Sequence, residues 1–392
     1  MRIRTALVLA GALTLTAAGP AAADSIVYVK SKDIWVANPD GSGQQRVTKN
    51  GSASRPYGSP SQADDGTIVA SRGEEIVRLR RDGKLLSHFN PPGTSDSAGQ
   101  PIDGVPQDIA VSPDGKRIAF SFYQYGCPVG ASCGARTVFL YSSAKAATPA
   151  AKGGKLFRRN ASWISNSRIL AFNGYLSQVN VDSPGGGDDD DQHWFDDQDL
   201  NQPSTDLGDG ELSRQGDRLV LIRNYGADSH LQFYAVSGDL RSGPPPGPPA
   251  PACHTGADAS VSGPSWSPDG RAVAFAISTG IETMSLPNVR PGDCGGASSS
   301  KLVIRGGSEP DWGPAAARAG TRGGSACRRL NGAKRDRCVR SAALAKCAKG
   351  SKRRRSACVR AAKRSYALKQ CKRLKRSSAR ASCVRKVRRR FP

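Results

Sequence analysis

The chain has 392 residues, enough for one large domain or two to three ordinary ones, and a formal net charge of +24. From Arg318 to Pro392 it has 28 basic side chains and one acid, Asp336, whereas the part before Arg318 has 29 basic and 32 acidic side chains. The 44 glycines and 26 prolines are too few for a chain disordered throughout but typical of a turn-rich β protein. The sequence therefore predicts a nearly neutral body and a polycationic tail.

The N-terminal segment 1–23 has the pattern of a secretory signal peptide. Arg2 and Arg4 precede an apolar run at positions 6–18, which is too short to span a bilayer, and small side chains place the cleavage between Ala23 and Asp24. No other apolar run is long enough for a transmembrane segment. We therefore expect a secreted or extracytoplasmic protein, with the cell wall as a candidate place of association.

Two segments of the body, 111–120 and 266–275, repeat one pattern. In each, Ser-Pro-Asp-Gly separates two strand-like runs; Pro and Asp favour a tight turn, and Gly takes a backbone conformation that other residues resist. Weaker copies lie at 63–70, 163–172 and 212–221. The turns recur with a period of roughly 50 residues, which is typical of propeller blades. The turn positions are Gly66, Gly115, Ser167, Gly216 and Gly270.

A sixth copy of the repeat is divided between the two ends of the body. The segment 309–314 matches the first half of the unit, and the segment 25–48 matches its second half. A blade built from both ends closes a propeller ring and leaves no exposed edge strand. The copies therefore predict an all-β fold, a six-bladed β-propeller.

The runs DIWVANPDGSGQQRVT and SPDGKRIAF resemble the repeat of TolB-type, WD-repeat-like six-bladed β-propellers. The resemblance covers the segment 25–314 and implies a fold more than a function, because such repeats occur in translocation-complex proteins, in peptidase propeller domains and in secreted proteins of unknown role. The copies at 163–172 and 212–221, in the fourth and fifth blades, depart from it by lacking Pro-Asp-Gly. The expected domains are a signal peptide at 1–23, the propeller at 24–314, a linker at 315–325 and a basic Cys-repeat helical module at 326–392.

The ten cysteines fall into even groups, four in the body and six in the tail, and an exported chain can pair them. In the body we predict the disulfides Cys127–Cys133 and Cys253–Cys294. In the tail, each of three cysteine pairs flanks a helix-breaking dipeptide, which favours three α-hairpins, each closed by a disulfide. The six tail cysteines are Cys327, Cys338, Cys347, Cys358, Cys371 and Cys383. Zinc binding is the alternative for this set, without a histidine or Cys-x2-Cys to support it.

Most candidate reactive residues of the body have plainer explanations. The segment 130–134 matches the nucleophile elbow G-x-S-x-G, but no helical pattern follows, so a disulfide-closed loop is favoured. Trp163, Trp266 and Trp312 recur at one repeat position, which indicates packing between blades. The histidines are scattered and have no zinc-binding spacing: His88, His193, His230 and His254.

One acidic loop is a candidate cation site. Asp188, Asp189, Asp190 and Asp191 form a carboxylate run, and Ca2+ prefers several oxygen ligands. The alternative is a solvated acidic loop, and no other cofactor is expected.

The tail is expected to bind anionic polymers or surfaces, because its charge is nearly all of one sign. Its densest basic clusters are Lys352, Arg353, Arg354, Arg355, Arg388, Arg389 and Arg390. We therefore predict an exported, non-catalytic binding or scaffold propeller, monomeric, with a protein or envelope ligand on its propeller face and a tail bound to the cell envelope. Three alternatives stay open: a hydrolase or lyase in the propeller channel, for which the sequence shows no convergent acids, bases or metal ligands; an extracellular nucleic-acid binder; and a tail that is only a solvated extension.

Overall fold

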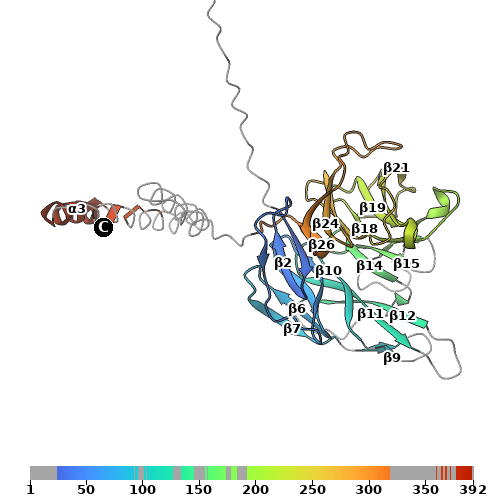
Figure 1. Ribbon diagram of the computed structural model, residues 1–392, viewed down its shortest axis with the longest axis horizontal. Helices are drawn as coiled ribbons and strands as arrows, with labels where there is room; N and C mark the ends of the chain where they lie inside the picture. Colours follow the sequence, from blue (N-terminus) through green and yellow to red (C-terminus); the bar gives the residue numbers. More distant parts are fainter. Residues whose placement is uncertain are drawn as a thin grey trace, which may run out of the picture. The chain divides into compact units, whose positions relative to one another are not determined.

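The fold is described from a computed structural model of the chain (Figure 1). The structure describes residues 24–91, 93–95, 101–102, 104–126, 134–144, 155–156, 158–173, 178–182, 192–317, 359, 363–364, 367–368, 371 and 377–390. The chain divides into two compact units, Met1–Ala317 and Arg318–Pro392. We call the described part of the first unit the body and the second unit the tail.

The body contains six four-stranded antiparallel sheets among its described residues, numbered here by the chain order of their strands. Sheet 1 consists of β26 (Ser308–Gly313), β1 (Ser25–Lys30), β2 (Asp33–Ala37) and β3 (Gln45–Arg46); sheet 2 of β4 (Tyr57–Gln62), β5 (Ile68–Arg72), β6 (Glu75–Leu79) and β7 (Leu85–Phe89); and sheet 3 of β10 (Pro106–Val111), β11 (Arg117–Gly126), β12 (Gly134–Ser143) and β13 (Lys155–Leu156). Sheet 4 consists of β14 (Arg158–Trp163), β15 (Ile169–Asn173), β16 (Gln178–Asp182) and β17 (Gln192–Asp196); sheet 5 of β18 (Leu207–Leu212), β19 (Arg218–Arg223), β20 (His230–Ala235) and β21 (Ala250–His254); and sheet 6 of β22 (Ser262–Trp266), β23 (Ala272–Ile277), β24 (Gly280–Ser285) and β25 (Lys301–Arg305). A short pair, β8 (Thr94–Ser95) and β9 (Pro101–Ile102), lies between sheets 2 and 3 in the chain.

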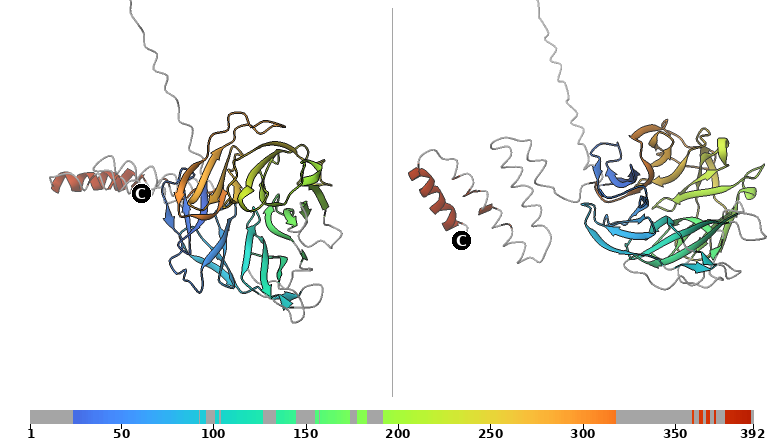
Figure 2. Two further views of the ribbon diagram at one scale, coloured as in Figure 1. Left: turned by 45° about the vertical axis from the view of Figure 1, so that its right-hand side comes forward. Right: turned by 60° about the horizontal axis from the view of Figure 1, so that its bottom comes forward.

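The first strand of each sheet in the order given is its inner strand. The inner strands contact one another in the order β26, β4, β10, β14, β18 and β22, and β22 also contacts β26. Figure 2 shows the sheets turning side by side around a common centre. This arrangement of sheets is a β-propeller.

The turns between the first two strands of a sheet follow the chemistry that the sequence predicts. Gly115 and Gly270 have φ of +70° and +67°, a left-handed conformation that favours glycine. The hydroxyl of Ser112 accepts the backbone N–H of Arg117 at 3.0 Å. This bond fixes the tight connection before the buried second strand.

Neighbouring sheets pack through large side chains that are almost fully buried. Phe195 of sheet 4 contacts Tyr234 of sheet 5, with ring centroids 5.8 Å apart. Phe233 of sheet 5 meets Trp266 of sheet 6 edge to face at 5.9 Å. Burial of such rings is the main favourable contribution to the fold.

The two ends of the body meet in sheet 1. β1 pairs antiparallel with β26, so that Ser25 lies opposite Gly313 and Ile26 opposite Trp312. The Ser25 hydroxyl donates to the carbonyl oxygen of Ala315 at 2.7 Å, 290 residues later.

This junction corrects the predicted linker, which began at residue 315. Nη1 of Arg81 donates to the carbonyl oxygen of Ala316 at 2.6 Å, and Ala317 is only 3% exposed. Ala315, Ala316 and Ala317 therefore belong to the body. The alanine-rich composition suggested a linker because composition does not reveal that Ser25 and Arg81, both buried, donate hydrogen bonds to the carbonyl groups of Ala315 and Ala316.

The tail has one long described helix, α3 (Ser377–Arg390). Cys383 of this helix forms a disulfide with Cys371, with Cα atoms 5.5 Å apart, as a stapled pair requires. The other tail cysteines lie outside the described residues. No described helix has both the length and the apolar character needed to cross a membrane.

Candidate functional site

Each inner strand is interrupted by a bulge in which its pairing with the second strand shifts. One residue of every bulge has a left-handed backbone, with φ between +28° and +57°. These six residues, the first ring, are Ser59, Asp108, Asn160, Asp209, Gly263 and Glu309. Residues other than glycine rarely adopt this backbone conformation. Where they do, a functional or packing constraint holds them in it.

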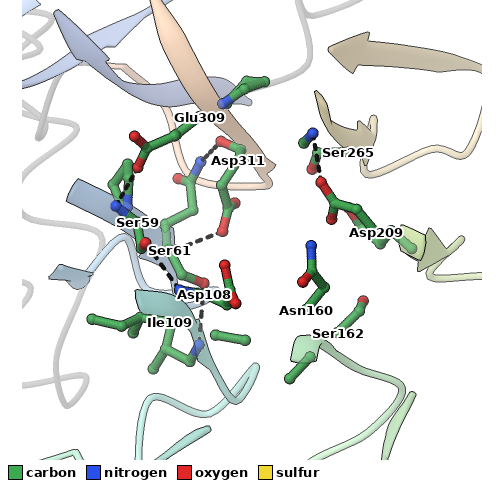
Figure 3. A pocket seen from close by; sticks show the side chains of 18 of the residues that line it. Ser59, Ser61, Asp108, Ile109, Asn160, Ser162, Asp209, Ser265, Glu309 and Asp311 are labelled. Atoms are coloured by element: carbon green, nitrogen blue, oxygen red, sulfur yellow. Dashed lines mark hydrogen bonds between the residues drawn. The ribbon is translucent and has the colours of Figure 1, made fainter. Parts of the chain in front are cut away.

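Two positions further along each strand lies a second ring, composed of Ser61, Ala110, Ser162, Glu211, Ser265 and Asp311. Both rings line a single cavity of about 830 Å³ at the centre of the propeller. Figure 3 shows Asp209 and Glu309 of the first ring and Asp311 of the second ring around this space. The two rings supply five carboxyl groups to the cavity.

In the first ring, side chains accept backbone N–H groups from the next sheet. The carboxylate of Glu309 accepts the N–H of Ser59, and the Ser59 hydroxyl accepts the N–H of Asp108 at 3.0 Å. On the other side of the cavity, Oδ2 of Asp209 accepts the N–H of Gly263 at 2.7 Å. These bonds explain the bulges, because they satisfy backbone N–H groups that the shifted pairing releases.

The second ring repeats the arrangement one layer deeper. Oδ2 of Asp311 accepts the N–H of Gln62 at 3.0 Å, and Oε2 of Glu211 accepts the N–H of Trp266 at 3.1 Å. The hydroxyl of Ser265 accepts the N–H of Trp312 at 2.9 Å. In Asp209, Glu211 and Asp311, one carboxylate oxygen is hydrogen-bonded to a backbone N–H of the next sheet. These bonds fix the positions of the three carboxyl groups.

The two acids of the second ring, Glu211 and Asp311, have raised pKa values. Loss of solvent around Glu211, together with the nearby charge of Asp311, raises the pKa of Glu211 to about 8. Loss of solvent also raises the pKa of Asp311, against the opposing effect of its hydrogen bonds. At neutral pH most Glu211 side chains are therefore protonated.

Glu309 differs because the residue is exposed, whereas Glu211 and Asp311 are half-buried. The surrounding protein raises its pKa, and the hydrogen bond from the Ser59 N–H opposes this rise. The three carboxyl groups therefore share one tendency, toward the protonated form.

One ion pair lies at the end of the cavity where the inner strands finish. Nη1 of Arg214, which follows β18, is 2.6 Å from Oδ1 of Asp64, which follows β4. In the order in which the inner strands contact one another, sheets 5 and 2 are three places apart, so this pair joins two sheets that are not neighbours. Arg214 is the only basic side chain among the described residues that line the cavity, and its charge lowers the pKa values of Glu211 and Asp311.

The arrangement is suited to binding a cationic group. Carboxylates from several sheets converge on one space, the single lining guanidinium is already paired with Asp64, and the hydroxyls of Ser162 and Ser265 add polar contacts. Among the residues described, no group of three or more His, Cys, Asp or Glu side chains has the geometry of a metal site. A carboxylate that has lost solvent is stabilised by an opposite charge, which an amine or a basic side chain would supply.

Sequence reasoning missed this site, because the sequence by itself shows no convergent acids near the axis, whereas the fold brings five carboxyl groups to one cavity. The carboxyl groups come from strands far apart in the chain, which is why no local motif reveals them. A positional signal does exist. Each first-ring residue from Ser59 to Gly263 lies seven positions before a turn marker, as Ser59 does before Gly66 and Asp209 before Gly216.

Other predicted sites are placed only in part. Cys253 and Cys294 form the predicted disulfide, with Cα atoms 5.8 Å apart. The carboxylate of Asp24, at the predicted cleavage point, accepts the indole N–H of Trp312 at 3.1 Å, while Ala23 lies outside the described residues. In α3, Arg388 and Arg389 are exposed. The described residues do not include Asp188–Asp191, Lys352–Arg355, or the cysteines Cys127 and Cys133.

The recurring tryptophans have the packing role that the sequence predicts. The indole N–H of Trp163 donates to the carbonyl oxygen of Ala110 at 2.9 Å, and that of Trp266 donates to the carbonyl oxygen of Glu211 at 3.0 Å. Each bond joins a strand to the inner strand of the preceding sheet. These rings therefore belong to the contacts between sheets.

The histidines are less scattered than the sequence suggests. His88 lies beside Glu75 and His193 beside Asp196. His230 and His254 lie together, with ring centroids 5.3 Å apart.

No known protein-family pattern matches the chain. No curated protein sequence matches it either. Among solved structures it is similar to TolB from Acinetobacter baumannii, with 17% identity and a TM-score of 0.45 over 74% of this chain and 66% of that one. It is also similar to a putative TolB from Agrobacterium tumefaciens (12% identity, TM-score 0.44, 73% of this chain and 91% of that chain) and to the periplasmic gluconolactonase of Pseudomonas aeruginosa (12% identity, TM-score 0.47, 74% and 98%). Because these TM-scores are below 0.5, the assignment of the β-propeller rests on the sheets and the cyclic contacts of their inner strands.

Proposed function

We propose that this protein is an exported, non-catalytic binding propeller, monomeric, which takes a basic group of its partner into the acidic cavity and is held at the cell envelope by its polycationic tail. The observation that carries the proposal is the convergence of five carboxyl groups, from sheets 1, 3 and 5, on one cavity whose only lining cation among the described residues is already paired.

The proposal includes a closed ring of six blades. It is supported by the pairing of β26 with β1 and by the contact of β26 with both β22 and β4. Deletion of the segment 308–314 removes the inner strand of sheet 1 and exposes β1 as an edge, so we expect aggregation or loss of cooperative unfolding. A deletion variant that melts like the intact body, or an experimental structure with another number of blades, would contradict the closed ring.

The cavity chemistry predicts a cationic ligand. The carboxyl groups of Glu211 and Asp311 lose solvent when the protein folds, which raises their pKa values, and a bound ammonium or guanidinium would return favourable charge interactions. Binding of a cation favours the ionised form of Glu211. Near neutral pH, binding should therefore release a proton, and affinity should rise with pH.

Calorimetry with a short lysine oligomer tests this role. We expect Glu211→Gln and Asp311→Asn to weaken binding by tenfold or more, because each removes a carboxylate but keeps an oxygen that accepts the same backbone N–H. Asp82→Asn is the matched control, since Asp82 is an exposed carboxylate that pairs with Arg80 outside the cavity. Equal affinities for all four proteins, or an affinity independent of pH, would overturn the cavity assignment.

The tail is proposed to anchor the protein by charge. Helix α3 carries five arginines, one lysine and no acid, and its disulfide with Cys371 fixes the position of the helix relative to that residue. Electrostatic binding to an anionic polymer weakens steeply with salt because counterions are released. Retention on anionic wall material should therefore fall with salt, and fall strongly when the chain ends at Ala317. Equal retention without the tail would exclude anchoring, whereas a preference for DNA over other polyanions of similar charge would favour the nucleic-acid alternative.

The enzyme alternative has one observation in its favour, the pKa of Glu211 at about 8 beside Asp311. A carboxyl group that keeps its proton near neutral pH can act as a general acid, and Asp311, which lines the same cavity, is the candidate general base of a hydrolase or lyase. A screen of lactone and glycoside substrates separates the two functions. Turnover that disappears in Glu211→Gln would establish an enzyme and replace the binding role.

A further inference from the structure

Two histidines from different strands meet on sheet 5, away from the central cavity. His230 begins β20 and His254 ends β21, and their ring centroids are 5.3 Å apart with planes inclined by 58°. His254 lies opposite Gln232 in the strand pairing, and Gln232 follows His230 by two positions. Because side chains alternate along a strand, the two histidines share one face of the sheet.

The hydrogen bonds of both rings fix the tautomer of the neutral imidazoles. Nδ1 of His230 lies 2.9 Å from the carbonyl oxygen of Asp228, and Nδ1 of His254 lies 2.8 Å from the carbonyl oxygen of Thr255. A carbonyl oxygen only accepts, so each Nδ1 carries a hydrogen and each neutral ring keeps its lone pair on Nε2. Histidines that bind metals are typically held in this way, with the second ring nitrogen donating to a carbonyl or carboxylate.

The spacing of the rings agrees with shared coordination. For metal–nitrogen distances of about 2.0–2.1 Å in a tetrahedral site, the centroids of two imidazoles on one ion lie about 5.2 Å apart. The observed separation of 5.3 Å is close to this value.

A disulfide and a side-chain hydrogen bond fix the end of β21, which carries His254. Cys253, directly before His254, is bonded to Cys294 of the loop between β24 and β25. Nε2 of Gln232 donates to the carbonyl oxygen of Cys253 at 2.9 Å. The position of His254 is therefore fixed before any ligand arrives, which lowers the entropy cost of binding.

We propose that His230 and His254 form a two-histidine binding site for a transition-metal ion, Zn2+ or Cu2+. Imidazole nitrogen is a preferred ligand of these ions. The described residues supply no third His, Cys, Asp or Glu ligand in the right geometry, so water completes the coordination shell. The site is independent of the proposed cavity function.

Titration of the full, oxidised chain with Zn2+ and with Cu2+ tests the site, with calorimetry for affinity and electron paramagnetic resonance for the nitrogen ligands of Cu2+. We expect one ion at this site, with two imidazole nitrogens in the Cu2+ spectrum. His230→Gln and His254→Gln should each weaken binding by at least tenfold and leave one imidazole in the spectrum.

The controls are His88→Gln and His193→Gln, because each of these rings lies beside a carboxylate and stacks on no second imidazole of the described chain. They should leave the affinity of this site unchanged. A Cu2+ spectrum with a single imidazole in the unaltered protein would overturn the proposal. So would equal losses of affinity in the control and test variants.

Discussion

The guanidinium of Arg81 donates a hydrogen bond of 2.6 Å to the hydroxyl of Ser25, 56 residues earlier in the chain. The same nitrogen donates to the carbonyl oxygen of Ala316, and the other terminal nitrogen donates to the side-chain oxygen of Gln62. Arg81 is 4% exposed. One buried cation therefore joins the start of the body, its end and the inner strand of sheet 2.

Replacement of Arg81 by methionine should strongly destabilise the body. The change removes three hydrogen bonds from a charged donor and deprives Ser25, Gln62 and Ala316 of that donor, at a cost on the order of 3 kcal/mol in the free energy of unfolding. Urea denaturation measures the difference. Arg80→Met is the control, since Arg80 is exposed and pairs with Asp82, and its effect should stay within about 0.5 kcal/mol. Similar losses in both variants would mean that the junction does not depend on Arg81.

The stability of the body should decrease as pH rises from about 4.5 to about 8. Glu211 has a pKa of about 8 in the folded protein against a model value of 4.5, so the folded chain binds more protons than the unfolded chain within this window. Stability then falls with increasing pH. The raised pKa values of Asp311 and Glu309 act in the same direction.

In Glu211→Gln the decrease should be visibly smaller, because one of the responsible groups no longer titrates. Denaturation curves at several pH values measure the slope. Glu75→Gln, which alters a carboxylate paired with Arg55 outside the cavity, should keep the slope of the unaltered protein. An identical slope in Glu211→Gln would show that Glu211 is not the group responsible.

Loss of the Arg214 charge should raise the pKa values of Glu211 and Asp311 further. In the unaltered protein this guanidinium favours the ionised form of both acids. Carboxyl-carbon NMR titration of Arg214→Met should therefore show both resonances titrating at higher pH. Arg55→Met, which removes a guanidinium paired with Glu75, should leave them in place. A downward shift in Arg214→Met would contradict the electrostatic description of the cavity.

The disulfide between Cys253 and Cys294 should stabilise the body by about 4 kcal/mol, the value that loop closure predicts for a sequence separation of 41. Denaturation of the double variant Cys253→Ser and Cys294→Ser measures this contribution. The same variant should bind Zn2+ more weakly, because β21 loses its link to the next sheet. Unchanged stability would mean that native strain offsets the gain in the unfolded state.

The sequence contains the local determinants of this fold. The Ser-Pro-Asp-Gly segments predict tight turns because the turn needs a left-handed residue, and Gly115 and Gly270 occupy that conformation. The division of one repeat between the segments 25–48 and 309–314 likewise predicts the pairing of β1 with β26.

The cavity was harder to predict because its chemistry depends on neighbouring sheets. Asp209 has a left-handed backbone and accepts the N–H of Gly263, 54 residues later, so its role exists only after two sheets are side by side. The same reasoning applies to His230 and His254, whose separation along the chain matches no ligand motif until the strands pair. Sequence patterns describe one strand or one turn at a time, whereas these sites are built from several.

The pairing of β1 with β26 also sets an order of events during synthesis. The ribosome makes β1 first, yet its inner partner is complete only when Gly313 has been added, so the first sheet to begin is the last to finish. Sheets 2 to 6 can assemble before that point, but the inner edge of β1 stays unpaired until β26 is made. A chain released shortly before Gly313 would contain nearly every sheet and still lack the strand that β1 needs. The body is therefore complete only when β26, its last strand, has been added. A chain that ends before β26 has an unpaired edge on β1, near its N-terminus.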